Sequence, residues 1–456
     1  MTQIKKLFFA AALAAALCPR AHSAPQNPHN YIEGERYELR PTQKVGKFGE
    51  NYDTSKIDIY KKLDILDKID ASGRITSVQD WLKQRPQVMD FVSRKLYTPV
   101  PPRPRSVQFR LLERSDNALN GAAIRMQFAV ISGDERGEHS FTLLLYVPKN
   151  VEKPAVFIHQ NFMGNHAAID DGDVIIPVCY LDSDNSSGEK TLPEREKCRN
   201  TRAYRHPIRE VVAAGYAYAT FCYNELYPDK YATQKSGVNE SIYKIYNPNR
   251  FKITPQAIAA WAFGNILALD CLESVAEVDA SRAAVVGHSR LGKAALYAGA
   301  VDERFKIVVS NSSCILGARM NRRNFGGTAK IAVESSTRWY SPELKKYVEN
   351  VETMPIDQQH LLACIAPRAL YVASATDDYW CDPEGEFMSL LQACEIYKLF
   401  GAKNTPTPAD LKVQTPFIGD VGHHIRIGNH NILLYDWLQY IKFADSKFGK
   451  PVFVSK

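Results

Sequence analysis

A serine near the middle of the sequence lies in a setting that suits acyl transfer. Ser289 follows the apolar run 283–286 and Gly287, and an Ala-rich helical pattern comes after it. That order predicts a strand, a tight turn and a helix, with the hydroxyl at the apex of the turn beside a helix N-terminus, where an oxyanion is stabilised. Gly287, two residues before the serine, permits the sharp turn. A second glycine is usually found two residues after such a serine, but here that residue is Leu291 and the glycine follows at 292. The sequence therefore predicts Ser289 as a nucleophile.

A serine nucleophile needs a base that takes its proton. Three histidines near the end of the chain are candidates: His423, His424 and His430. His430 falls between Gly428 and the last helical pattern, 433–441, which is where a base belongs after a final strand. The other two fall in or before the preceding strand. We therefore predict His430 as the base, with His423 and His424 as alternatives.

An acid must orient that base. The strand pattern 370–374 is followed by Asp377 and Asp378, which places both carboxylates at the carboxyl end of a strand. Asp378 is preferred because Asp382 and Pro383 follow it at a spacing suited to entering the next helix. The predicted triad is thus Ser289, His430 and Asp378, with Asp377 as the alternative acid.

Two cations adjoin the predicted nucleophile. Arg290 follows it directly and can offer its main-chain N–H, and its guanidinium, to a developing oxyanion. Lys293 lies in the first helical turn, where it should be partly buried and within reach of a sugar hydroxyl. The loop 159–166 follows the first core strand and is a candidate for further oxyanion or pocket backbone.

The elements that must position these residues follow from the pattern of apolar runs. Short strand-like runs alternate with helical patterns, which predicts a doubly wound α/β sheet in three layers. The parallel runs lie at 155–158, 216–222, 283–286, 307–310 and 370–374, and helical patterns at 255–273, 290–300 and 385–399. Three earlier runs, at 107–112, 123–130 and 140–147, predict an antiparallel edge. Residues 106–450 form the predicted catalytic domain.

The first part of the chain divides into a leader and an extension. Residues 1–23 have the basic start, apolar run and small-residue end of a signal peptide, which predicts a secreted or periplasmic protein. Residues 24–105 are predicted to form an amino-terminal extension that packs on the main domain and contributes no catalytic residue. Within it, 77–96 is amphipathic, and Pro86 is expected to split it into two short helices.

Charge and cysteine content exclude several classes of function. The formal charge of +7 falls to +4 without the leader, and no Lys/Arg cluster stands out, so nucleic acid is not indicated. The leader's apolar run is too short to span a bilayer, and no other membrane segment is predicted. No Cys-x-x-Cys occurs, so a structural zinc site is not expected. We also expect no other metal, no cofactor and a monomeric chain.

Of the cysteines beyond the leader, Cys179 and Cys198 flank a polar loop and are the candidate disulfide. Four others lie in apolar stretches and are predicted to be buried free thiols: Cys222, Cys271, Cys364 and Cys394.

Several motifs together carry a specific resemblance. They are 161–166, 287–293, 365–374, 380–386, 424–430 and 435–437, and the likeness covers most of 77–445. In these motifs the sequence resembles the bacterial glucuronoyl esterases of the fifteenth carbohydrate esterase family, which belongs to the α/β-hydrolase superfamily. The resemblance implies an enzyme that cleaves the ester between 4-O-methyl-glucuronic acid of glucuronoxylan and lignin alcohols without a metal.

The resemblance also assigns residues. It implies Ser289 as nucleophile, His430 as base, Arg290 in oxyanion stabilisation, and Lys293 with Trp380 in contact with the uronic sugar. Two positions depart from the pattern. Ser312 stands where many members carry the acid of the triad as Glu, which moves that role to Asp378, and Arg338 stands where His is expected, which alters sugar recognition.

Two other functions fit the same sequence. An acetyl-xylan or other carbohydrate esterase would use the same scaffold, with a peptidase as a more distant possibility. A catalytically impaired glycan-binding protein is the alternative from another class, because position 312 lacks the Glu.

Overall fold

One ten-stranded sheet organises the protein. The computed structural model describes residues 26–57, 63–177, 196–229, 241–451 and 453. Within them the strand order is β1-β2-β3-β5-β4-β6-β7-β8-β10-β9. The strands are β1 (Ser106–Ala118), β2 (Ala123–Asp134), β3 (Gly137–Pro148), β4 (Val156–Asn161), β5 (Ala217–Cys222), β6 (Ala283–His288), β7 (Phe305–Asn311), β8 (Ala369–Ala375), β9 (Phe417–Ile418) and β10 (Gly422–Arg426).

The sheet combines an antiparallel edge with a parallel centre. Strands β1, β2 and β3 pair antiparallel, and β3 pairs antiparallel with β5. From β5 to β10 every neighbouring pair is parallel, and β9 closes the far edge antiparallel to β10. The central strands are short and buried at nearly every position, as expected where helices cover both faces. The predicted mostly parallel sheet is confirmed.

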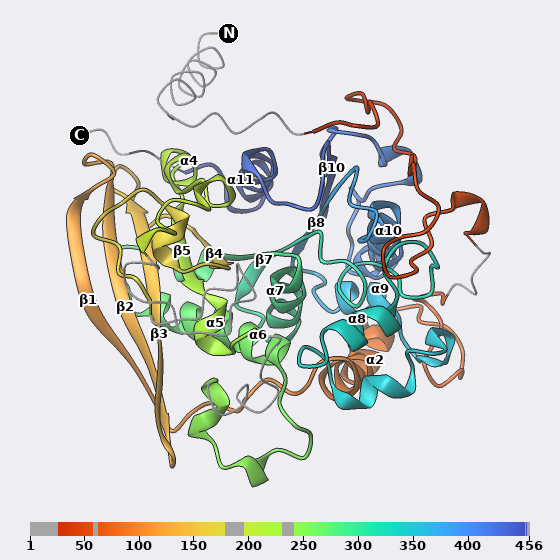
Figure 1. Ribbon diagram of the computed structural model, residues 1–456, viewed down its shortest axis with the longest axis horizontal. Coiled ribbons are helices and arrows are strands. Elements are labelled where there is room, and N and C mark those ends of the chain that lie inside the picture. The colour runs from red at the N-terminus through yellow and green to blue at the C-terminus, as the bar shows by residue number, and fades with distance from the viewer. Residues whose placement is uncertain (1–25, 58–62, 178–195, 230–240, 452, 454–456) are drawn as a thin grey trace.

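Helices cover the two faces of this sheet (Figure 1). One apolar cluster joins the sheet to α2 (Val78–Phe91), α6 (Ala257–Glu273), α7 (Arg290–Val301), α9 (Gln358–Ala363) and α10 (Pro383–Leu399). A second cluster joins the opposite face to α4 (Ile208–Ala213) and α11 (Leu434–Phe448). The short helices α5 (Tyr223–Leu226) and α8 (Ala329–Ser335) lie in connections. The three-layer α/β architecture is therefore as predicted.

Helix α2 differs from its prediction. It runs without interruption through Pro86, so the expected split at that residue is wrong. Trp81 and Val88 are fully buried on either side of Pro86, and their packing holds the helix across the hydrogen bond that proline removes. The α-helical geometry ends only after Phe91, where Val92–Leu96 forms a π-helical turn.

The amino-terminal extension contacts the loop that follows β8. The Tyr37 hydroxyl donates to the main-chain oxygen of Thr376 at 2.8 Å, and Nδ1 of His29 lies 2.6 Å from an oxygen of Asp377. The extension therefore supports the segment from which Asp378 projects. The predicted leader, 1–23, lies outside the described residues. Among the residues that are described, no helix has the length and apolar character needed to cross a membrane.

A disulfide joins Cys314, in the loop after β7, to Cys381, in the loop after β8. The sequence did not single out this pair. The predicted partner of Cys198, Cys179, lies outside the described residues, so that pairing stays a prediction. The four predicted buried thiols are confirmed as free and buried: Cys222, Cys271, Cys364 and Cys394.

Candidate active site

Ser289 occupies a strand–turn–helix elbow. Strand β6 ends at His288, α7 begins at Arg290, and Ser289 between them has φ 59° and ψ −128°. A Cβ on Gly287 would collide with the main-chain carbonyl of Leu291, so only glycine fits there. A Cβ on Gly292 would come within 2.9 Å of the Ser313 side chain, so the close approach of these two segments favours glycine at 292. The chain holds this serine in a backbone conformation typical of a nucleophile elbow.

His430 and Asp378 meet at the same edge of the sheet. Nδ1 of His430 lies 2.6 Å from Oδ2 of Asp378, whose side chain is buried, whereas the histidine is 38% exposed. The imidazole of His430 also lies 4.6 Å, between ring centroids, from that of His288, the residue before Ser289. The neighbouring Asp377 contacts His29 instead. The structure thus brings together the residues predicted as acid and base, beside the elbow.

The alternative histidines lie within β10 and contact other groups. His423 donates from Nδ1 to the main-chain oxygen of Val372 at 3.0 Å, and burial lowers the pKa of His423 to about 3. His424 lies between the Tyr371 hydroxyl, 2.8 Å from Nδ1, and Asp436, 2.8 Å from Nε2. Both rings are fully buried. Neither contacts Asp378.

The position at which the resemblance expects the acid is occupied by a buried serine. Ser312 follows β7 with φ 44°, and its hydroxyl has no hydrogen-bond partner among the described residues. The Cys314–Cys381 disulfide ties this loop to the one carrying Asp378. The carboxylate next to His430 therefore comes from the end of β8 rather than β7.

This disulfide also bears on metal binding. Ligand atoms of Cys314, Asp378, Cys381 and His430 lie within 4.8 Å of one another. Metal ions bind cysteine as the thiolate, and two sulfurs joined to each other are not thiolates. The cluster therefore does not fit a metal site.

Arg290 is held by an anionic and aromatic cluster. Its guanidinium pairs with the buried carboxylate of Asp229 and lies 4.5 Å from the centre of the Trp339 ring. The other oxygen of Asp229 accepts from Nε1 of Trp339 at 2.8 Å. A cavity of about 220 Å³ adjoins this cluster, lined by Asp229, Trp339 and residues 334–338. The arrangement fixes a cation one residue from the elbow, next to an open polar space.

Lys293 is more buried than the sequence suggested. It is 3% exposed and donates from Nζ to the main-chain oxygen of Ser313. Burial lowers the pKa of Lys293 to about 7. Burial likewise raises the pKa of Glu386 to about 8, although Glu386 accepts hydrogen bonds from the Ser374 hydroxyl and from the amide of Cys314. Lys293 and Glu386 are thus a buried base and a buried acid, and both contact the segment 313–314 after β7.

Trp380 is half-buried in the loop after β8. A Cβ on Gly327 would come within 2.8 Å of its indole, and the amide of Gly327 donates to the main-chain oxygen of Trp380 at 3.0 Å. The ring therefore rests on a glycine backbone, two residues beyond Asp378. Its assignment to the sugar stays a prediction.

Sequence reasoning missed three of these features. Asp229 lies in the long polar insertion 224–254, which has no hydrophobic periodicity and no motif that would single out this residue. Glu386 is an acidic residue within the apolar pattern of α10, and that contrast was an available signal. The Cys314–Cys381 pair had no signal, because both cysteines stand alone in loops.

Among proteins with a mostly parallel sheet, the α/β-hydrolases carry a nucleophile on such an elbow and place the acid and the histidine on loops after later strands. The protein has this fold. Comparison with known proteins then gives the family. A family model described as glucuronyl esterase, fungi, matches residues 203–401.

Carbohydrate esterase MZ0003, from an unknown prokaryotic organism, is 34% identical over 404 residues, which are 87% of this chain and 92% of that protein. The structure of a glucuronoyl esterase from Solibacter usitatus is similar with a TM-score of 0.78 and 33% identity, over 87% of this chain and 100% of that one. The 4-O-methyl-glucuronoyl methylesterase 1 of Sodiomyces alcalophilus is 33% identical over 185 residues, 38% of this chain and 37% of that protein. The chain belongs to the glucuronoyl esterase family, and it is a carboxylic ester hydrolase.

Proposed function

We propose that the protein hydrolyses the ester that links (4-O-methyl-)glucuronic acid of glucuronoxylan to lignin alcohols. The observation that carries the proposal is the contact between Asp378 and His430 beside the Ser289 elbow. The names of the similar proteins support the uronic acid as the acyl part of the substrate.

The reaction proceeds through an acyl-enzyme. Asp378 engages Nδ1 of His430, which leaves Nε2 of that ring to take the proton of the Ser289 hydroxyl as the oxygen attacks the uronoyl carbonyl. Main-chain N–H groups at the start of α7 and the guanidinium of Arg290 stabilise the oxyanion. His430 then protonates the departing alcohol, and a water molecule, deprotonated by the same ring, releases the acid.

Recognition of the acyl part rests on the sugar. The indole of Trp380 suits the apolar face of a pyranose ring. The resemblance also gives Lys293 to the sugar; because its Nζ is buried and donates to the Ser313 carbonyl, it would have to bind a sugar hydroxyl through another of its three N–H groups. We expect the alcohol side to face solvent. We further propose that residues 1–23 direct export, which would bring the enzyme to a polymeric substrate outside the cytoplasm.

The test compares benzyl glucuronate with an acetylated xylose as substrates for the wild type and Ser289→Ala. We expect higher kcat/KM on the glucuronate and a loss of about three orders of magnitude or more in the variant. A preference for the acetyl ester would instead favour a carbohydrate acetylesterase. Binding of xylan with no hydrolysis that depends on Ser289 would favour the glycan-binding alternative.

A further inference from the structure

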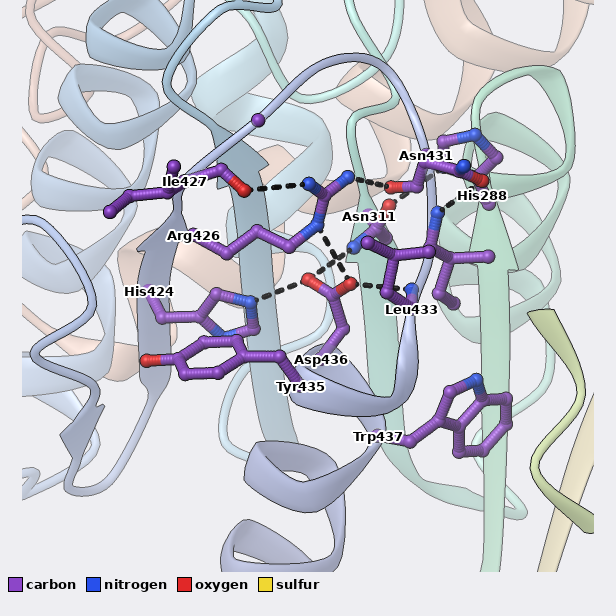
Figure 2. A network of polar contacts seen from close by, with 12 residues as sticks. His288, Asn311, His424, Arg426, Ile427, Asn431, Leu433, Tyr435, Asp436 and Trp437 are labelled. Carbon is purple, nitrogen blue, oxygen red and sulfur yellow. Dashed lines mark hydrogen bonds and ion pairs between the residues drawn. The ribbon is translucent and has the colours of Figure 1, made fainter. Parts of the chain in front are cut away.

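The loop that carries His430 is bound from within by one arginine. Arg426, the last residue of β10, donates to the main-chain oxygens of Ile427, Asn429 and Asn431, at 3.1, 2.7 and 2.7 Å. These carbonyls lie on both sides of His430 in the chain. Figure 2 shows the guanidinium inside the curve of the loop, between Ile427 and Asn431.

Asp436 holds that arginine in turn. Nε of Arg426 donates to Oδ2 of Asp436 at 2.9 Å, and the amide of Leu433 donates to the same oxygen at 2.7 Å. Nε2 of His424 lies 2.8 Å from Oδ1. Asp436 is fully buried, and although burial alone would raise its pKa, the charge of Arg426 and the contact with His424 hold it below its usual range. The carboxylate therefore joins the start of α11 to the end of β10.

The same network reaches the nucleophile side of the site. The amide nitrogen of Asn311, at the end of β7, donates to Oδ1 of Asp436 at 3.3 Å. The amide oxygen of Asn311 lies 2.7 Å from Nδ1 of His288, the residue before Ser289. A chain of contacts thus runs from the loop of the base to the strand of the elbow (Figure 2).

We propose that Arg426 and Asp436 are positioning residues that set the distance between the His430 ring and Ser289. The inference rests on the proposed function only in that it takes His430 as the base. Both side chains are buried, so neither is expected to touch substrate. A planar guanidinium has several N–H donors in a fixed fork and can bridge three carbonyls and a carboxylate, whereas a lysine ammonium is a compact charge that cannot reach both sides of the loop.

A displacement of the base by about 1 Å costs on the order of 100-fold in rate. Arg426→Met is therefore expected to lower kcat by about 30- to 100-fold while KM changes less than about twofold, because sugar contacts come from other loops. Arg426→Lys, which keeps the charge but not the fork, should recover part of this loss.

Arg368→Met is the matched control. Arg368 also donates to main-chain carbonyls, those of Asp302 and Phe305, but it lies at the amino end of β8, opposite the site. This variant should keep kcat within about twofold. If Arg426→Met does not fold, the double variant Arg426→Met with Asp436→Asn takes its place, because it leaves no lone buried charge.

Two measurements separate positioning from general stability. In a His430→Ala background, Arg426→Met should cause no further loss of rate, since there is no ring left to position. The rate at which a fluorophosphonate labels Ser289 should fall with kcat, and this label needs no uronic sugar. Labelling of every variant at the wild-type rate, or an equal loss of kcat in Arg368→Met, overturns the positioning role. A wild type that labels fast but leaves benzyl glucuronate intact would overturn the proposed function alone.

Discussion

The carboxylate of Asp378 lies 2.6 Å from Nδ1 of His430, on the loop after β8. In many members of the family, by the resemblance, the acid would follow β7, where this chain has Ser312. Both strands end at the same edge of the sheet, so an acid from either can reach the imidazole. Although residue 312 is not Glu, the site therefore still has an acid, which is Asp378.

Asp378→Asn tests this arrangement. The amide cannot stabilise the imidazolium or hold the correct tautomer, so kcat should fall by about 10³- to 10⁴-fold. Asp377→Asn is the control, because its carboxylate contacts His29, and it should stay within about threefold of the wild type. Initial rates on benzyl glucuronate give both values. Equal effects of the two substitutions would contradict the assignment.

Asp229→Asn tests how Arg290 is held. The substitution weakens the ion pair but keeps an acceptor for the Trp339 indole, so the guanidinium should become mobile. We expect kcat to fall by about tenfold, less than the 10²- to 10³-fold expected when Arg290→Met removes an oxyanion donor outright. In the Arg290→Met background, Asp229→Asn should have no additional effect on kcat. An additive loss would mean that Asp229 acts by another route.

Removal of the disulfide should cost both stability and rate. Cys314 and Cys381 are 67 residues apart in sequence, for which loop closure corresponds to about 4 kcal/mol of unfolding free energy. Replacing both with serine also frees the loop of Asp378, so we expect a drop in kcat of about tenfold. Urea denaturation and steady-state rates measure the two effects, with Cys271→Ala, a buried free thiol, as control. A stability loss no larger than that of the control would argue against the disulfide.

The buried Glu386 predicts a pH dependence of stability. Burial raises its pKa from 4.5 to about 8, so the folded state holds a proton that the unfolded state releases. The stability that comes from holding this carboxyl protonated is fully present below pH 4.5, and it is lost as the pH rises toward 8 because the unfolded state can then release the proton. In the wild type the free energy of unfolding should therefore fall between pH 5 and 8. Glu386→Gln removes the titrating group, so this fall should be smaller by a few kcal/mol, since each unit of pKa shift corresponds to about 1.4 kcal/mol. Urea denaturation at pH 5.5 and 7.5 checks the slope, and an unchanged slope would contradict it.

The order of elements and the elbow could be predicted from the sequence because local patterns specify them. Apolar runs marked the central strands, and Gly287 before Ser289 marked the turn. The placement of His430 and Asp378 followed from the chain order of α/β-hydrolases, in which the acid follows a late strand and the base precedes the last helix. These inferences needed periodicity and chain order only.

The remaining features depend on how loops fold over one another. The contacts of Asp229 with Arg290 and of Arg426 with the His430 loop join residues whose types are common on surfaces. Arg426 falls within the motif 424–430, but nothing in that motif indicated which groups its side chain contacts. The extension gave no sign that it packs on the loop of Asp378, because its contacts with that loop use scattered tyrosine and histidine side chains. Pro86 misled the prediction, since packing on both sides outweighed the local cost.

The central claim is that Ser289 becomes acylated by a uronic acid, and trapping the intermediate tests it most directly. The enzyme would be mixed with a nitrobenzyl ester of glucuronic acid, quenched in acid during turnover, digested and analysed by mass spectrometry. We expect one uronoyl group on the peptide containing Ser289, and none in Ser289→Ala. Turnover accompanied by an adduct on another residue, or by full activity of Ser289→Ala, would contradict it.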